Sequence, residues 1–297
     1  MVPPPAPICW PICWPRAWRR DRYHHDGQPA AGGWAALDGE LDAWQAAGRP
    51  ARFWWRDDDA VAPGPALDRL LNRARHHRLP LALAVIPATA TEALARRLDA
   101  EPPGLRVLLH GWSHQNHARP DKKKSELACG RPLDEMLDDL ARGRDRLTTL
   151  FASRCLAVLT PPWNRLPVPL IQRLPEIGIN GLSRFKPRKR PMPAANVVEI
   201  NTHVDPIDWR GTGDFVGEDA ALAAITRHLA ARRAGLADPD EPTGLLTHHL
   251  VHSAALDAFL DRLSVRLTSH PAAVWDDPAH LFTPSANRLP PIETAPR

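Results

Sequence analysis

From about residue 50 onward, short apolar runs alternate with longer segments in which apolar residues recur at helical spacing. The short runs are almost free of polar residues, which is typical of strands buried on both faces of a parallel sheet. The longer segments carry charges on one face, which predicts helices that cover such a sheet. We therefore expect strands near 51–55, 79–87, 105–110, 155–163, 179–183, 196–205, 243–252 and 272–277, and helices near 65–78, 91–100, 132–151, 168–178, 218–235 and 254–269.

The alternation gives about seven strand–helix units in roughly 240 residues, which favours a closed or nearly closed α/β barrel over an open sheet. We expect one barrel domain over residues 49–284. Residues 1–48 are rich in Pro, Trp and Arg and lack the alternation, so we expect them to be disordered or peripheral. Residues 285–297 are expected to form a flexible C-terminal tail.

Composition narrows the function classes. The formal net charge is only +4, and basic residues are interleaved with acidic ones, so we expect no nucleic-acid partner. The basic cluster at 184–190 is interpreted as a solvated loop in preference to an anion site. No window of 18 apolar residues exists, so no membrane partner is expected. Four cysteines are too few for a disulfide framework, and the N-terminus lacks a convincing secretory signal, which together indicate a cytoplasmic protein.

Unusual polar residues gather where the predicted strands end. They lie at 56–59, 110–117, 160–165, 203–209 and 248–252, and three of these segments hold seven of the 14 histidines. In a parallel barrel the carboxyl ends of the strands share one face, and that face carries the active site. The pattern therefore predicts a single site built from five strand ends.

Two histidines and an acidic triplet make this a candidate metal site. His110 and His114 are four residues apart, so one helical turn would point both rings the same way. Two imidazoles and one carboxylate commonly hold zinc or another divalent ion with positions left open, and Asp58 or Asp59 can supply the carboxylate. The triplet at 57–59 also needs a compensating charge. The alternative is that the histidines are exposed or only hydrogen-bonded.

The order of these motifs resembles the polysaccharide deacetylase family (NodB-homology domain, carbohydrate esterase family 4). An acidic pair, H-x-x-x-H, Pro–Pro–aromatic, Asp–Trp and a Leu-rich strand ending in His follow one another across roughly residues 50–282. The resemblance implies a distorted (β/α)7 barrel with a single catalytic domain. It also implies metal-dependent removal of an N-acetyl group from a sugar or a related small substrate.

The resemblance assigns the metal site and the base. Asp58 would be the base that takes a proton from the attacking water, and Asp59 would be a metal ligand; Asp57 and Asp58 form the other possible register. His110 and His114 match the two metal histidines of the family. The implied cofactor is one divalent ion, for which we expect zinc.

The remaining motifs supply the other catalytic groups. The main-chain N–H of Trp163 would help to hold the oxyanion, and His248 would be the general acid that protonates the departing amine. His249, directly behind it, is the alternative acid, since only one of two neighbours on a strand can face the pocket. Asp208 is the candidate partner of His248, and Trp209 would line the pocket.

Two positions depart from the family pattern. Thr160 stands where the family has an arginine that braces the base, and Ala60 replaces the glycine of the first motif. Arg56 and Arg165 are the candidates to replace that arginine. A catalytically silent carbohydrate-binding module is therefore the alternative function. The other residues expected around the pocket are Arg56, Asp57, Trp112, Asn116, His117 and Arg165.

Overall fold

The structure, a computed structural model, describes residues 33–283. The expectations for residues 1–32 and for the tail at 285–297 lie outside the described residues. The helices are α1 (Trp34–Ala46), α2 (Pro65–His76), α3 (Glu92–Asp99), α4 (Leu133–Phe151), α5 (Val168–Arg173), α6 (Glu218–Arg233), α7 (Ala254–Ser269) and α8 (Pro278–Leu281). The strands are β1 (Ala51–Ala60), β2 (Leu81–Val85), β3 (Leu105–Leu109), β4 (Cys155–Leu159), β5 (Gly181–Leu182), β6 (Val198–Glu199), β7 (Thr243–Thr247) and β8 (Ala273–Trp275).

The strands form one parallel sheet in the order β6-β5-β4-β3-β2-β1-β7, with β8 paired to the start of β1. Beyond β6 the chain continues along β7, where Val204 forms a bridge with Leu245. The curled sheet therefore closes into a ring through that single bridge. This confirms the predicted distorted (β/α)7 barrel, in which β5 and β6 are only two residues long.

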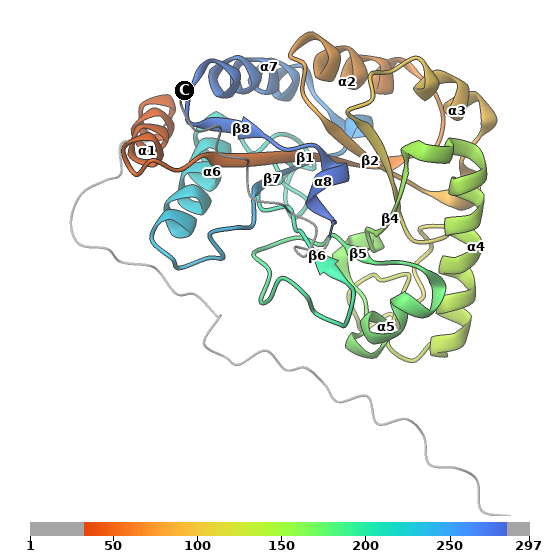
Figure 1. The fold of residues 1–297 in the computed structure, drawn as a ribbon. Helices are drawn as coiled ribbons and strands as arrows, with labels where there is room; N and C mark the ends of the chain where they lie inside the picture. The colour runs from red at the N-terminus through yellow and green to blue at the C-terminus, as the bar shows by residue number, and fades with distance from the viewer. Residues whose placement is uncertain (1–32, 284–297) are drawn as a thin grey trace, which may run out of the picture.

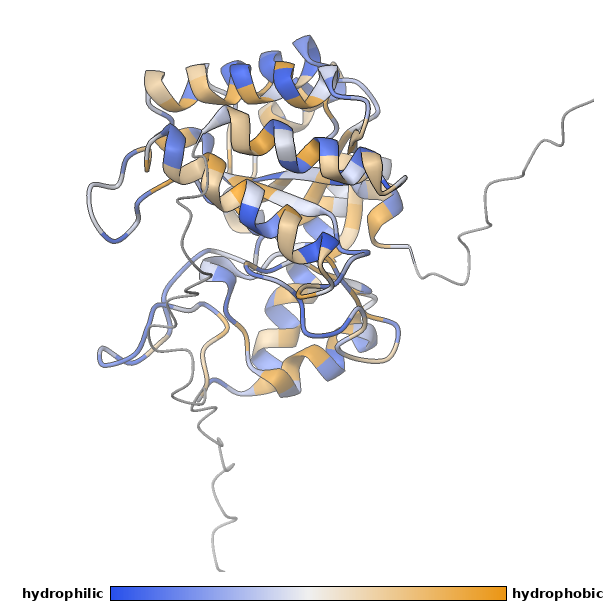
Figure 2. Ribbon diagram, turned by 90° about the vertical axis from the view of Figure 1, so that its left-hand side faces the viewer, coloured by the Kyte–Doolittle hydropathy of each residue, from blue (hydrophilic) through white to orange (hydrophobic). Residues whose placement is uncertain are grey.

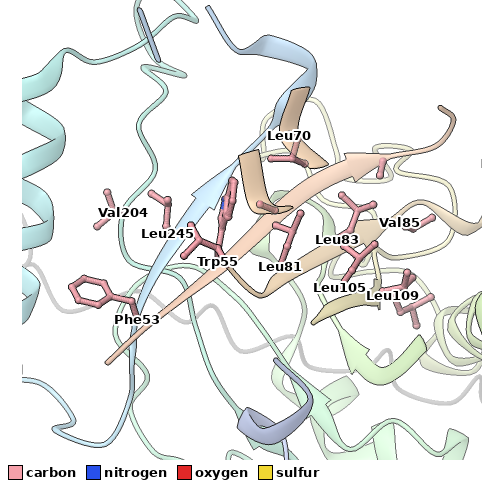
Figure 3. Packing of buried hydrophobic residues seen from close by; sticks show 14 of the residues in the cluster. Phe53, Trp55, Leu70, Leu81, Leu83, Val85, Leu105, Leu109, Val204 and Leu245 are labelled. Atoms are coloured by element: carbon pink, nitrogen blue, oxygen red, sulfur yellow. The ribbon is translucent and has the colours of Figure 1, made fainter. Parts of the chain in front are cut away.

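Alternating side chains along the strands divide the interior into two apolar clusters. Phe53 and Trp55 of β1 pack with Leu81 and Leu83 of β2 in the larger cluster, between the strands and the covering helices (Figure 3). The smaller cluster takes the opposite face of the same strands and is closed by α8. Its members are Trp54, Ala82, Ala84, Leu108, Val158, Val198, Ile200, Leu281 and Phe282.

Helices cover the outside of this sheet. In Figure 1, α7, α2 and α3 lie along one side of the ring, α4 and α5 along the next, and α6 with α1 at the far end. Hydrophobic and hydrophilic residues mix along the helices that Figure 2 shows, as expected for elements with one buried face. Among the helices of residues 33–283, none is long and apolar enough to cross a membrane.

Helix α1 corrects the expected domain boundary. Residues 34–46 fall within the segment expected to be disordered or peripheral, yet they form a helix whose Leu37, Leu41 and Trp44 are at most 1% exposed. Trp44 also contacts the guanidinium of Arg232 on α6, with 5.0 Å from the carbon to the ring centroid. Strand–helix alternation could not reveal α1, because this helix precedes the first strand and belongs to no unit.

Candidate active site

The carboxyl end of β1 distributes its polar residues over two faces. Trp54, Arg56 and Asp58 alternate toward the inside of the barrel, and Asp57 points the other way with Trp55. Arg56 is fully buried and binds Asp58 through two parallel hydrogen bonds, Nε to Oδ1 at 2.9 Å and Nη2 to Oδ2 at 3.0 Å. Asp58 is therefore held by a bidentate arginine within its own strand.

Asp59 breaks the alternation. Its backbone has φ 74°, and the pairing with β2 shifts register between Asp57 and Ala60. This local bulge turns the Asp59 carboxylate toward two histidines. Its Oδ1 lies 3.0 Å from Nε2 of His110 and 3.4 Å from Nε2 of His114. The potential ligand atoms of these three residues all lie within 4.8 Å of one another.

Hydrogen bonding fixes which nitrogen of His110 faces this cluster. Its Nδ1 donates to the carbonyl oxygen of Thr160 at 2.9 Å, on the neighbouring strand end. With its donor at Nδ1, the neutral imidazole of His110 carries its lone pair at Nε2, the atom beside Asp59, and the protonated ring donates from the same atom to Asp59. The ring of His114 packs 5.1 Å from that of His110, centroid to centroid.

The pKa values in the cluster follow from burial and from its own charges. Burial opposes ionisation of Asp59, but the hydrogen bond from His110 and the nearby histidine charges outweigh it and hold its pKa well below the usual range. Burial likewise opposes protonation of His110, yet Asp59 and Asp58 raise its pKa overall. The pKa of His114 is lowered by burial and by the charge of His110. The carboxylate and a neutral imidazole are both forms that bind a metal.

A buried glutamate builds the turn that presents His114. Glu126 is 1% exposed, and its carboxylate accepts the backbone N–H groups of Trp112, Ser113 and His114 at 2.7 to 3.3 Å. Gly111 precedes these residues with φ 62°, and a Cβ there would stand 2.0 Å from a Glu126 oxygen. Sequence reasoning missed Glu126, because the residue lies in a polar loop and no spacing rule links it to the motif.

The Pro–Pro–Trp segment packs against the cluster from β4. Trp163 has φ 54°, and its ring lies 4.3 Å from that of His114. Asn164, also left-handed with φ 57°, accepts a hydrogen bond from Nη2 of Arg56 at 3.0 Å. Nη1 of Arg56 donates to Ser183 Oγ at 2.6 Å. Thr160, in the arginine position of the family motif, is fully buried with its hydroxyl unpartnered among the described residues.

His248 lies beside Trp209 and Asp205. The Trp209 ring stands edge-on to His248 at 4.8 Å, and its Nε1 donates to Asp205 at 2.8 Å. Burial raises the pKa of Asp205, and the charge of His248 partly offsets that effect. The expected pairing of His248 with Asp208 is wrong. Both Asp208 oxygens accept backbone N–H groups of residues 210–212, because an aspartate at the start of a tight turn satisfies that turn first.

His249 faces away from His248 and binds Asp57. Its Nδ1 lies 2.5 Å from one Asp57 oxygen, and its backbone N–H donates to the other at 3.0 Å. The hydroxyl of Thr247 also donates to Asp57, at 2.6 Å. Asp57 and His249 are therefore bound to each other on the outer face of β1 and β7. The geometry does not support His249 as the general acid. It also does not support the alternative register, in which Asp57 is the base and Asp58 the metal ligand.

Four further predicted residues lie on the loops around the site. Trp112 packs under the guanidinium of Arg142, 3.9 Å from ring centroid to carbon. Asn116 accepts two backbone N–H groups of its own loop, and His117 is exposed. Arg165 donates from Nη1 to the Lys124 carbonyl at 2.6 Å.

Comparison with known proteins identifies solved structures of the same fold but finds no match in sequence. No protein-family model and no curated protein matches the sequence. A structure from Mycobacterium smegmatis assigned as a polysaccharide deacetylase matches with a TM-score of 0.54 at 15% identity, over 78% of this chain and 89% of that one. A family 4 carbohydrate esterase from Streptomyces lividans matches with a TM-score of 0.48 at 17% identity, over 76% and 91%. A family 4 acetyl xylan esterase from Clostridium thermocellum, in complex with cobalt, matches with a TM-score of 0.47 at 15% identity, over 78% and 90%.

The similarity covers most of both chains. The chain therefore has the fold of the polysaccharide deacetylases of carbohydrate esterase family 4.

Proposed function

We propose that this protein is a metal-dependent deacetylase that removes an N-acetyl group from a sugar or a related small substrate. The observation that carries the proposal is the convergence of Asp59, His110 and His114 from two strand ends, beside the braced carboxylate of Asp58. A likeness in fold alone supports many chemistries, so the proposal depends on the geometry of these groups.

The three residues fit a divalent ion, for which we propose zinc. In the neutral imidazole of His110 the lone pair lies at Nε2, the lowered pKa of His114 favours its neutral form, and the lowered pKa of Asp59 favours its carboxylate. Three protein ligands with remaining positions open are typical of catalytic zinc. When bound, the ion would act as a Lewis acid on the acetyl carbonyl and would acidify water.

The remaining catalytic roles belong to side chains and backbone groups of the protein. Asp58 takes the proton from the attacking water, and Arg56 holds the Asp58 carboxylate in place through two hydrogen bonds. Arg56 thereby fills the bracing role that Thr160 cannot fill. The backbone N–H of Trp163 helps to hold the oxyanion. His248, which lies beside Trp209, protonates the departing amine.

Two substitutions test this assignment. Asp58→Asn should abolish turnover of N-acetylated sugars by the zinc-loaded protein while one metal stays bound, because a base is lost but no ligand. His248→Ala should also keep the metal and cost roughly 10²–10⁴-fold in kcat. Asp219→Asn, on the exposed start of α6, is the matched control. Unchanged turnover in both site variants would contradict the mechanism.

The second candidate is a binding module that holds a sugar without turning it over. Thr160 favours the binding module, because an uncharged threonine stands where the family motif has an arginine. Metal binding together with sugar binding, and no hydrolysis across a panel of N-acetyl sugars, would select this candidate.

A further inference from the structure

The guanidinium of Arg56 has a hydrogen-bond acceptor for each of its five N–H donors. Nε and Nη2 donate to the two carboxylate oxygens of Asp58, at 2.9 and 3.0 Å. Nη2 also donates to Oδ1 of Asn164 at 3.0 Å. Nη1 donates to Oγ of Ser183 at 2.6 Å and to the Arg184 carbonyl oxygen at 3.3 Å. This fully buried group is therefore held from two directions, by Asp58 and by acceptors outside β1.

The acceptors outside β1 lie across the barrel. Asn164 follows β4 and Ser183 follows β5, and in the sheet β2 and β3 stand between β1 and β4. The pair of Arg56 with Asp58, in contrast, lies within one strand. Arginine has a large side-chain conformational freedom, which a partner two residues away on the same strand restricts only in part. Acceptors on two distant strand ends fix the plane of the guanidinium, and that plane sets the orientation of the Asp58 carboxylate.

The two acceptor side chains are themselves held by backbone hydrogen bonds. Asn164 has φ 57° and follows Trp163 with φ 54°, and its N–H donates to the Pro161 carbonyl at 2.8 Å. Ser183 is fully buried, and its N–H donates to the Leu159 carbonyl at 2.9 Å. Both acceptors are thus fixed to the end of β4 independently of Arg56.

We infer that Asn164 and Ser183 are positioning residues, which orient the catalytic base Asp58 through the guanidinium of Arg56. The inference rests on the proposed function and deepens it. In the family pattern the bracing arginine stands at position 160, on the end of β4 itself. Here the arginine stands on β1, and the side chains of Asn164 and Ser183 connect it to the ends of β4 and β5. Neither residue is assigned a contact with the substrate, so both should affect kcat and leave KM unchanged.

Substitutions at Asn164 separate its side chain from its backbone. Asn164→Gly keeps the left-handed conformation without strain and removes the acceptor. We expect kcat of the zinc-loaded protein on an N-acetylated sugar to fall roughly 10-fold, the scale of losing one hydrogen bond to a charged group. KM and bound zinc should not change. Ser183→Ala should behave in the same way.

Asn164→Asp retains an acceptor for Arg56 and should keep kcat within about threefold of the wild type. Asn196→Gly is the matched control, because Asn196 is exposed in another turn and has φ 59°. An unchanged kcat in Asn164→Gly would overturn the inference. An equal loss in Asn164→Asp and Asn164→Gly would do the same.

A double-mutant cycle tests whether Asn164 acts through Arg56. Arg56→Lys keeps the buried charge but loses the planar fork that binds Asp58 and Asn164 together. If Asn164 acts through that fork, adding Asn164→Gly to Arg56→Lys should change kcat by less than about twofold. A further loss as large as in the wild-type background would show that Asn164 supports only its own turn, against the inference.

A measurement without turnover separates this inference from the proposed function. Nitrogen-15 spectra of arginine-labelled protein report the rotation of the guanidinium, and the Arg56 signals are those that Arg56→Lys removes. We expect separate signals for the two Nη atoms in the wild type and merged or broadened signals in Asn164→Gly. Separate, sharp signals in Asn164→Gly would refute the inference, even in an active enzyme. Merged signals in Asn164→Gly, with no hydrolysis by the wild type, would support the anchoring of Arg56 and count against the proposed function alone.

Discussion

At the scale of single residues, the three consecutive aspartates have three different partners. Asp57 binds His249 on the outer face, Asp58 binds Arg56 on the inner face, and Asp59 joins the two site histidines through its left-handed backbone. Strand alternation predicts that Asp57 and Asp58 face opposite ways. It does not predict the bulge at Asp59, because the register shift depends on pairing with β2.

Glu126 provides a residue-scale prediction. Glu126→Gln replaces a carboxylate that accepts three backbone N–H groups with an amide that has one acceptor oxygen. The turn carrying His114 should loosen, and we expect zinc affinity to fall roughly 10–100-fold, as it does when supports behind a ligand are removed. Zinc titration with a competing chelator measures this. Glu135→Gln, exposed on α4, should bind like the wild type, and unchanged affinity in Glu126→Gln would refute the role.

At the scale of elements, the predicted strand and helix positions agree with the structure wherever a strand–helix unit repeats. The carboxyl ends of the strands and the grouping of His110 with His114 follow from that repeat. The pattern failed in two places. Helix α1 stands outside the repeat, and the partner of His248 depends on the path of an irregular loop after β6. Side chains in that loop satisfy their own turn first, as Asp208 does.

Helix α1 provides the element-scale prediction. Trp44 is 1% exposed and packs on α6 through Arg232. Trp44→Ala should reduce the free energy of unfolding by about 3–5 kcal/mol, the usual cost of emptying a buried aromatic site. Urea unfolding measures it, with Gln45→Ala on the exposed face of α1 as the control. A loss below about 1 kcal/mol would restore the view that this segment is peripheral.

At the scale of the whole molecule, ring closure depends on the segment after β6. His203 in that segment accepts the Gly244 N–H at Nδ1 (2.9 Å) and stacks on His228 of α6 at 3.6 Å between ring centroids. Burial and the charge of Arg232 lower the pKa of both histidines, and that of His228 falls to about 2. Arg188 adds to the effect on His203, and Glu241, whose pKa burial raises to about 7, lies 3.2 Å from it.

Acid should therefore weaken the closure. Below pH 6.5 the unfolded chain protonates these histidines and the folded chain does not. The stability that they support is thus complete above 6.5 and is lost as the pH falls. Each neutral histidine should contribute a slope of ~1.4 kcal/mol per pH unit in that range. We expect His228→Gln to flatten the fall in unfolding free energy between about pH 6 and 4.5, measured with urea. The exposed His76→Gln should keep the wild-type slope, and an identical slope in both variants would contradict this account.

The bulge at Asp59 has a consequence for how this site can be altered. Because the three neighbouring carboxylates bind three different groups, substitutions at 57, 58 and 59 should act first on different properties: under the proposed function, on fold stability, on the rate and on metal binding, in that order. A single-residue insertion or deletion in the same stretch would scramble all three assignments at once. A change in the length of this strand end should therefore be more disruptive than a single substitution within it.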